Sequence, residues 1–275
     1  MDFIRRSLGT LACQSLLACA LASTVFTLGC ASPAAPVDPA VRQVLAPTGT
    51  LRVGVYPGSP TSLVVDAKTG QRAGVAHDLG PQLAQRLGTD VQVIEFARLA
   101  LVLDALKAGQ IDFTITNATD VRARDMDFTQ PLVQLELGYL VASGSPLMAV
   151  ADIDRPAIRV GVSQGSSSQG VLSREFKNAT VIPASSLKQA QDMLRQKTID
   201  AFATNTGILF EMSDELPGSR VLAGRWGLEN LAIAIPKGRD AGRPCVNAFA
   251  DSVRTNGQLQ AAITRSGLRG TSSAP

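Results

Sequence analysis

The sequence predicts an α/β protein built from two similar lobes, and two internal repeats are the reason. The tetrapeptide Arg-Val-Gly-Val occurs at residues 52–55 and again at 159–162. A second set recurs at a constant spacing, since Leu106, Ile111, Asp112, Thr116 and Asn117 are matched by Leu194, Ile199, Asp200, Thr204 and Asn205. Strands that alternate with helical patterns predict parallel sheets, whose ligands bind beyond the carboxyl ends of the strands. We therefore expect two Rossmann-like lobes that face each other across a cleft.

The first lobe follows from periodicity and from helix-stop residues. Residues 50–56 alternate as a strand does, whereas Leu79, Leu83 and Leu87 fall on one face of a helix that Gly88 ends. Gly109 ends a second, shorter helix. The predicted order is strand 50–56, helix 75–87, strand 90–96, helix 99–108 and strand 111–116. This β-α-β-α-β unit is complete at Asn117.

The second lobe repeats the pattern between two candidate crossings. The apolar run 138–143 leads into it, and the extended run 231–235, before Pro236, leads back. Its predicted elements are strand 154–162, helix 187–196 and strand 199–204. Two crossings predict a two-strand hinge. The expected division is lobe 1 at 48–140 with 236–270, lobe 2 at 141–235 and a tail at 271–275.

The N-terminal segment 1–29 has the order of an export signal. Arg5 and Arg6 precede an apolar stretch at 8–28, and small residues follow it. The stretch approaches the roughly 20 residues that span a bilayer, so a permanent membrane anchor is the alternative.

Cysteine usage points to a lipid attachment site. Cys13 and Cys19 lie inside the signal, and Thr27-Leu28-Gly29-Cys30 resembles a bacterial lipobox, although Thr27 departs from the usual aliphatic residue. Leu16-Leu17-Ala18-Cys19 is the alternative, but it would leave an apolar mature N-terminus. We expect acylation at Cys30, followed by a flexible tether at 30–47 that is rich in Ala and Pro. Cys245 is expected to be a buried apolar residue on a C-terminal helix.

Composition excludes several function classes. With a net charge of +3, no long basic run and 4% aromatic residues, the chain lacks the features of a nucleic-acid-binding protein. His77 is the only histidine and has no cysteine or carboxylate cluster beside it, so we expect neither metal nor cofactor. No nucleophile-base set or clear carboxylate pair is recognisable, and we do not expect an enzyme.

Residues 49–268 resemble the extracellular solute-binding proteins of bacterial ABC importers, in particular the amino-acid type. The resemblance rests on segments 51–55 and 106–115, on Arg122 followed by Asp127-Phe128, and on segments 161–167 and 199–201. It implies the periplasmic binding protein-like type II fold, in which two lobes close on a small solute. An ABC permease in the inner membrane is the implied partner.

The resemblance assigns the carboxylate of an amino-acid ligand to Arg122 and to the loop Gly165-Ser166-Ser167. A guanidinium suits this task because its planar fork matches a carboxylate and stays charged. A Gly-rich turn that opens a helix presents free N–H groups to an anion. The alternatives are a surface ion pair of Arg122 with Asp125 or Asp127, and simple helix capping by the serines.

Asn205 departs from the family, which places an aspartate there to bind the ligand's α-ammonium. The loss leaves an ammonium without its charged partner, which puts ordinary amino acids in doubt, unless Asp120 or Glu136 restores the charge. Asn117, the repeat-related amide, and Thr119 join the predicted ligand set, although an amide there also suits a loop anchor. Tyr56 is predicted as an aromatic platform, with loop packing as the alternative.

These observations predict a solute receptor in the periplasm, attached to the membrane as a lipoprotein and monomeric. It would bind a small anionic or zwitterionic solute and deliver it to the permease. A ligand-sensing partner of a membrane signalling protein is one alternative, and an exported dehydratase-like enzyme on the same fold is another.

Overall fold

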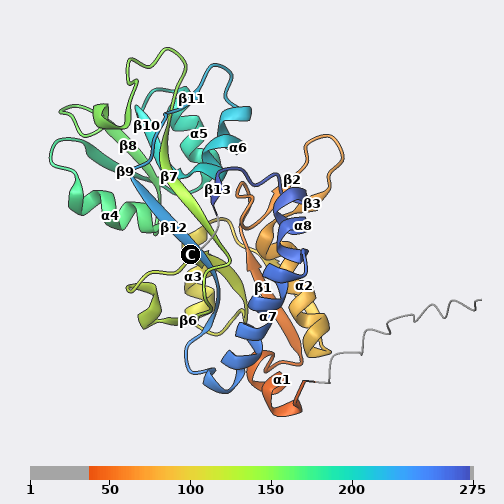
Figure 1. Ribbon diagram of the computed structural model, residues 1–275. Helices are drawn as coiled ribbons and strands as arrows, with labels where there is room; N and C mark the ends of the chain where they lie inside the picture. Colours follow the sequence, from red (N-terminus) through yellow and green to blue (C-terminus); the bar gives the residue numbers. More distant parts are fainter. Residues whose placement is uncertain (1–36, 273–275) are drawn as a thin grey trace, which may run out of the picture. The chain divides into compact units, whose positions relative to one another are not determined.

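The computed structural model describes residues 37–272, and these form two α/β lobes (Figure 1). The predicted signal at 1–29, the acylation site Cys30 and the start of the predicted tether lie outside the described residues. None of the helices within 37–272 is both long enough and apolar enough to cross a membrane.

The first lobe contains the predicted β-α-β-α-β unit. Strand β1 pairs in parallel with β4, and a parallel bridge between Val53 and Phe113 joins it to the segment that leads into β5. The elements are β1 (Thr50–Val55), β2 (Val64–Val65), β3 (Arg72–Ala73), α2 (Val75–Leu87), β4 (Asp90–Glu95), α3 (Leu99–Lys107), β5 (Thr114–Asn117), η1 (Arg122–Arg124) and β6 (Met126–Phe128).

The second lobe repeats this order. Strand β8 lies between β9 and β10 and is parallel to both. Its elements are η2 (Val150–Asp152), β8 (Arg159–Ser163), α4 (Ser167–Glu175), β9 (Thr180–Ala184), α5 (Leu187–Arg195), β10 (Ala201–Asn205), α6 (Thr206–Asp214) and β11 (Arg220–Val221).

Two long antiparallel strands connect the lobes. They are β7 (Val133–Val141) and β12 (Gly227–Pro236), which pair with each other. Strand β12 also pairs with β5, and β7 pairs with β10, so a sheet of order β5-β12-β7-β10-β8-β9 runs through both lobes (Figure 1). The crossing predicted at 231–235 is thus part of a longer strand, and the one predicted at 138–143 overlaps the end of β7, which begins earlier and stops at Val141. The exact lobe boundaries stay a prediction.

The internal repeat has a structural cause, which is an arginine-aspartate contact used once in each lobe. Arg52 donates from its backbone N and from Nε to Asp112 Oδ2 at 2.9 and 2.8 Å, and from Nη2 to Oδ1 at 2.7 Å. Arg159 makes the same three hydrogen bonds to Asp200, at 2.8, 3.0 and 2.9 Å. Each contact ties the first strand of a lobe to the start of its third.

The repeated glycine is explained by the repeated isoleucine. A Cβ atom added to Gly54 would lie 2.2 Å from Cδ1 of Ile111, and one added to Gly161 would lie 2.5 Å from Cδ1 of Ile199. Both separations are well inside van der Waals contact. The two halves of the repeat therefore fit each other as residue pairs, and neither half is a chance match.

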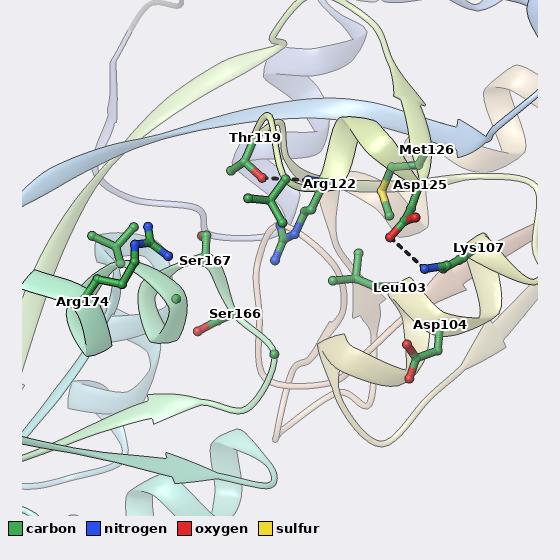
Figure 2. A pocket seen from close by; sticks show the side chains of 14 residues that line it. Leu103, Asp104, Lys107, Thr119, Arg122, Asp125, Met126, Ser166, Ser167 and Arg174 are labelled. Atoms are coloured by element: carbon green, nitrogen blue, oxygen red, sulfur yellow. Dashed lines mark hydrogen bonds and ion pairs between the residues drawn. The ribbon is translucent and has the colours of Figure 1, made fainter.

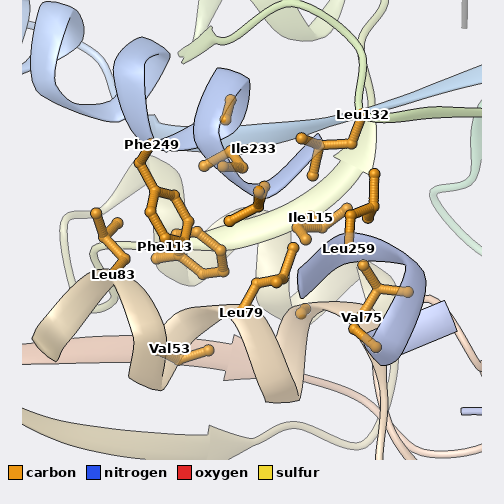
Figure 3. Close-up of a cluster of buried hydrophobic side chains, with 14 of the residues drawn as sticks. Val53, Val75, Leu79, Leu83, Phe113, Ile115, Leu132, Ile233, Phe249 and Leu259 are labelled. Atoms are coloured by element: carbon orange, nitrogen blue, oxygen red, sulfur yellow. The ribbon is translucent and has the colours of Figure 1, made fainter. Parts of the chain in front are cut away.

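Helices cover both faces of each lobe's sheet. In the first lobe, α2 packs with the C-terminal helices α7 (Arg243–Thr255) and α8 (Gln258–Arg265) against one face, whereas α3 contributes to a separate cluster. Figure 3 shows the larger cluster, in which Leu79 of α2 and Phe249 of α7 meet Phe113 and Ile233 of the sheet. In the second lobe, Leu172 of α4 and Leu194 of α5 belong to separate clusters.

The predicted tether differs from the structure in its second half. Residues Pro39–Leu45 form helix α1, with Asp38 as its N-cap. Leu45 is 1% exposed and belongs to the first-lobe core, where Gly242 of η3 (Asp240–Gly242) lies against it. This helix was not predicted, because the segment is rich in Ala and Pro and few of its residues pack on the core.

The C-terminus forms a third connection between the lobes. After α8, Arg269 contacts Asp214 of α6 and lies over the Phe210 ring at 5.0 Å. Strand β13 (Thr271–Ser272) then pairs with β7 at Leu135 and Gln134. Residues 269–272, predicted as the end of lobe 1 and a tail, thus bind the second lobe and the hinge. Cys245, partly buried near the start of α7, packs on the first-lobe core.

Candidate functional site

Arg122 is the best-defined residue of the candidate site. It lies on η1 and is 8% exposed. Its Nη1 donates to Oγ1 of Thr116 at 2.8 Å and to the carbonyl oxygen of Asn117 at 3.2 Å. Its Nη2 is buried and has no hydrogen-bond partner within residues 37–272. One nitrogen therefore fixes the guanidinium, and the other remains to bind an anion.

The predicted alternative for Arg122, a surface ion pair, is wrong. Asp125 pairs with Lys107 at 2.9 Å, and Asp127 pairs with Lys237 at 2.8 Å. Arg124, two residues away, is exposed. Burial lowers the pKa of Arg122, and the negative charge of Glu229 acts in the opposite direction.

The loop at 165–167 opens α4 as predicted, and most of its polar atoms are used locally. Oγ of Ser166 accepts from the amide of Gln169 at 3.1 Å, and the Gln169 side chain accepts from the amide of Gly165 at 2.7 Å. Capping, the predicted alternative, therefore describes Ser166. The amides of Ser167 and Ser168 lie in the first helical turn and have no intrahelical partner, as at any helix start.

A cavity of about 330 Å³ lies between α3 and η1 on one side and α4 on the other. Figure 2 shows Arg122 pointing into the space between Ser167 and Leu103. Its walls include five predicted site residues, which are Thr119, Arg122, Gly165, Ser166 and Ser167. Leu103, Val121 and Arg174 also line it and were not predicted. This volume is in the range of small-ligand pockets.

Two strand-tip amides meet neighbouring residues of the hinge strand. Asn117, at the end of β5, accepts at Oδ1 from the amide of Asn230 at 2.9 Å and donates from Nδ2 to Oγ of Ser167 at 3.0 Å. Asn205, at the end of β10, caps α6 through Oδ1 and donates from Nδ2 to Oε2 of Glu229 at 2.8 Å. Both amides are buried, and each bonds through its oxygen and its nitrogen, as the loop-anchor alternative predicted.

Tyr56 follows β1 and is 9% exposed. It belongs to the apolar cluster of α3, together with Val102 and Leu106. Burial raises its pKa, and both Glu229 and Arg122 lie close enough to act on it electrostatically. The residue is therefore packed in the core and also next to the charged groups of the site. Its role as an aromatic platform stays a prediction.

Glu229, which contacts the predicted site residue Asn205, was missed by sequence reasoning. It lies on β12, and burial raises its pKa, against which the Asn205 hydrogen bond and the Arg122 charge act. The two carboxylates considered from the sequence are elsewhere, since Asp120 is exposed and Glu136 pairs with Arg225 at 2.9 Å. The sequence did indicate which face of the strand Glu229 lies on, because it alternates in phase with Leu231, Ile233 and Ile235, which are all buried core residues.

The family model for bacterial extracellular solute-binding proteins, family 3, matches residues 51–266. The chain belongs to this family. In this solute-binding protein, the buried Arg122 and the loop that opens α4 lie at the cleft between the lobes. The family model describes its members as extracellular.

Two curated relatives of this solute-binding protein are named glutamine-binding proteins. The ABC transporter protein of Bacillus subtilis (strain 168) is 23% identical over 194 residues, 69% of this chain and 71% of the relative. The Geobacillus stearothermophilus protein is 24% identical over 193 residues, 69% and 73% of the two chains.

Solved structures agree in fold. The solute receptor for L-cysteine of Neisseria gonorrhoeae has a TM-score of 0.73 at 22% identity, covering 82% of this chain and 92% of its own. An ancestral amino-acid-binding protein that is a precursor of cyclohexadienyl dehydratase has a TM-score of 0.70 at 22% identity, covering 82% and 98%.

Metal ligation has no candidate in the part of the chain that the structure describes. Within residues 37–272, no group of three or more His, Cys, Asp or Glu side chains is close enough to hold an ion. The charged and polar side chains that line the cavity are those of Arg122, Arg174, Lys107, Asp104, Asp125, Thr119, Ser166 and Ser167. This set suits reversible binding of a small charged solute.

Proposed function

We propose that this protein is the extracytoplasmic receptor of an ABC importer, which closes its lobes on a small carboxylate-bearing solute and delivers it to a permease. The observation that carries the proposal is the buried Nη2 of Arg122, which has no partner within residues 37–272 and faces the cavity. A desolvated guanidinium nitrogen is costly unless it binds an acceptor. A solute carboxylate meets that need with two oxygens.

Closure on the solute requires contacts from both lobes, because a ligand stabilises the closed state only by its extra affinity for that state. Arg122 belongs to the first lobe and Ser167 to the second. The hydrogen bond from Asn117 to Ser167 already joins the lobes beside the cavity. A carboxylate between Arg122 and the first turn of α4 would add a second such connection.

The solute class proposed is an amino acid or a related organic acid. The relatives named for glutamine and the receptor named for L-cysteine support this choice. The cavity favours a small molecule, since its volume is about 330 Å³. Glutamine and cysteine are therefore the first members of the ligand panel.

The proposed setting is the periplasm. Residues 1–29 would direct export and Cys30 would carry the lipid, so that the receptor remains near its inner-membrane permease as a monomer. Labelling with a radioactive fatty acid, compared between the natural chain and Cys30→Ala, tests the anchor.

Two other functions share this fold. A receptor that reports to a membrane signalling protein would bind the same solute. Deletion of the permease should abolish growth on that solute if the protein serves import, and should leave growth unchanged if it serves only signalling. An enzyme would need an acid in the cleft, for which Glu229 is the candidate. Product formation from a prephenate-like acid would favour the enzyme.

A thermal-shift screen of the chain from Ala31, freed of carried-over ligand, tests the main proposal. The panel contains amino acids, their analogues without the α-ammonium group, and mono- and dicarboxylates. A ligand at about 100 times its Kd adds ~2.7 kcal/mol, or about 5 to 11 °C for a protein of this size. A shift with any carboxylate supports the proposal.

Arg122→Ala is expected to weaken carboxylate binding at least about 30-fold in calorimetric titration, since a buried charged contact is lost. Arg122→Lys retains the charge but loses the fork, and we expect an intermediate affinity. Arg124→Ala, an exposed neighbour, should bind normally. Circular dichroism checks that each variant is folded. Undiminished binding in a folded Arg122→Ala protein would show that the site lies elsewhere.

A further inference from the structure

A carboxylate stands between the strand ends of the two lobes. Glu229 is adjacent to Asn230 on β12, and these two residues receive the side-chain contacts of Asn205 from the second lobe and of Asn117 from the first. Strand β12 itself connects the lobes. The Glu229 carboxylate is thus held where both lobes meet the hinge, and its neighbour Asn230 bonds to Asn117, whose carbonyl oxygen accepts from Arg122.

This half-buried carboxylate has few partners among the described residues. Its one hydrogen-bond partner within residues 37–272 is the neutral amide of Asn205, at 2.8 Å. The charge of Arg122 opposes the rise in its pKa, and Glu229 in turn raises the pKa of Tyr56. No ion pair within 4.0 Å joins Glu229 to Arg122 or to any other cation of the described chain.

The separation of Glu229 from Arg122 points to an occupant that carries both charges. A carboxylate offers about four acceptor positions, and Asn205 fills one of them. A charge that is partly withdrawn from water is normally paired. Arg122 has an unfilled donor on the other side. A cationic donor that enters together with a carboxylate would satisfy both groups at once.

We propose, on the basis of the proposed function, that Glu229 binds the ammonium group of the solute and makes the site specific for zwitterions. The carboxylate is supplied from the hinge strand, whereas the residue at the strand tip, Asn205, positions it. Asn205 does this with Nδ2 while its Oδ1 caps α6. The doubt that Asn205 raised about amino acids is resolved by a residue 24 positions further along the chain.

A purely structural role makes a different prediction. If Glu229 only balanced the charge of Arg122, then its loss would change the affinity for acids with and without an ammonium group by the same factor. If Glu229 binds the ammonium, the loss falls on the ammonium-bearing ligand alone. The ratio of the two affinities therefore distinguishes the roles.

The test is calorimetric titration of Glu229→Gln with matched ligands, L-glutamine against 4-carbamoylbutanoate and L-alanine against propanoate. The amide that replaces the carboxylate keeps an oxygen that accepts from Asn205. We expect the natural protein to prefer the amino acid, and Glu229→Gln to reduce that preference at least about 30-fold. The affinity for the acid without ammonium should change less than about threefold. Glu136→Gln, which removes an exposed carboxylate of β7, is the control and should keep the preference.

Rescue gives a second readout. In Glu229→Gln with Asn205→Asp, the carboxylate returns to the strand tip, and we expect the preference for amino acids to recover. Unchanged preference in Glu229→Gln overturns the inference. So does a natural protein that binds only the acids without ammonium, although the proposed function then stands. A natural protein that binds neither class overturns both.

Discussion

The side chain of Glu229 is maintained at an energetic cost to the ligand-free protein. Burial raises its pKa above the ordinary 4.5, which means that the folded state holds the proton more tightly than the unfolded chain does. Ionisation of Glu229 therefore lowers the free energy of unfolding, and this loss grows as pH rises from about 4.5 through the raised pKa. Binding groups that destabilise the free protein are common at functional sites.

Glu229→Gln is expected to raise the free energy of unfolding of the ligand-free protein at pH 7. The gain should disappear as pH falls below about 4.5, where the natural side chain is protonated in both states. Arg122 and Tyr56, the ionisable neighbours, do not titrate in this range. Urea unfolding at several pH values measures the difference, with Glu136→Gln as the control. A variant that is less stable at pH 7 would mean that the Arg122 attraction outweighs burial.

The residues of the candidate site differ in whether a short stretch of sequence is enough to predict them. Arg122 and the serines of 165–167 were predicted, because each sits in a short motif with its own chemistry. Glu229 was not, because its partners Asn205 and Arg122 are remote in sequence and only the fold brings them together. Asn205 was recognised as a departure, but its double use by α6 and Glu229 depends on side-chain geometry.

Secondary structure was predictable wherever local patterns determine it. Helix α2 has the predicted bounds, since its apolar face and the left-handed Gly88 mark both. Strands β7 and β12 are longer than predicted, because a strand shared by two lobes has no sequence mark at the point of crossing. Helix α1 was missed, since seven residues with one buried side chain give almost no periodicity.

The repeated arginine-aspartate contact is buried to different extents in the two lobes, so it allows the effect of burial on its strength to be tested. The Asp112 side chain is 0% exposed and also pairs with Arg239, whereas the Asp200 side chain is 28% exposed. Asp112→Ala leaves two arginines without their carboxylate and should cost about 3 kcal/mol or more. Asp200→Ala should cost about 1 kcal/mol. Urea unfolding of both variants gives the comparison, and equal costs would show that burial does not set the strength of this contact.

Three chain segments connect the lobes, and the third is the least expected. Strands β7 and β12 form the hinge, while residues 269–272 bind α6 and β7. The lobes also touch through Asn117 and Ser167. Each contact of the C-terminal segment therefore contributes to the balance between the closed and open arrangements of the lobes.

Arg269→Ala is expected to weaken solute binding up to about fivefold, because an exposed ion pair and a cation–π contact between the lobes are worth about 1 kcal/mol together. Arg265→Ala is the matched control, since Arg265 pairs with Asp78 at 2.8 Å inside the first lobe. Calorimetric titration of both variants checks the difference. Equal affinities would show that the C-terminal segment moves with the second lobe without restraining it.

The bond between Asn205 and Glu229 also limits the evolutionary paths open to this receptor. An aspartate at 205 beside Glu229 would bring two carboxylates into contact, and like charges at that distance repel strongly. Loss of Glu229 beside an asparagine would remove the acidic group that we propose for the ammonium. Each single substitution is thus expected to weaken ammonium binding. An ancestor with the aspartate would have reached the present pair only through an intermediate with weaker binding or through a change of both residues together. If Glu229 has the proposed role, the Asn205–Glu229 pair is therefore hard to replace one residue at a time.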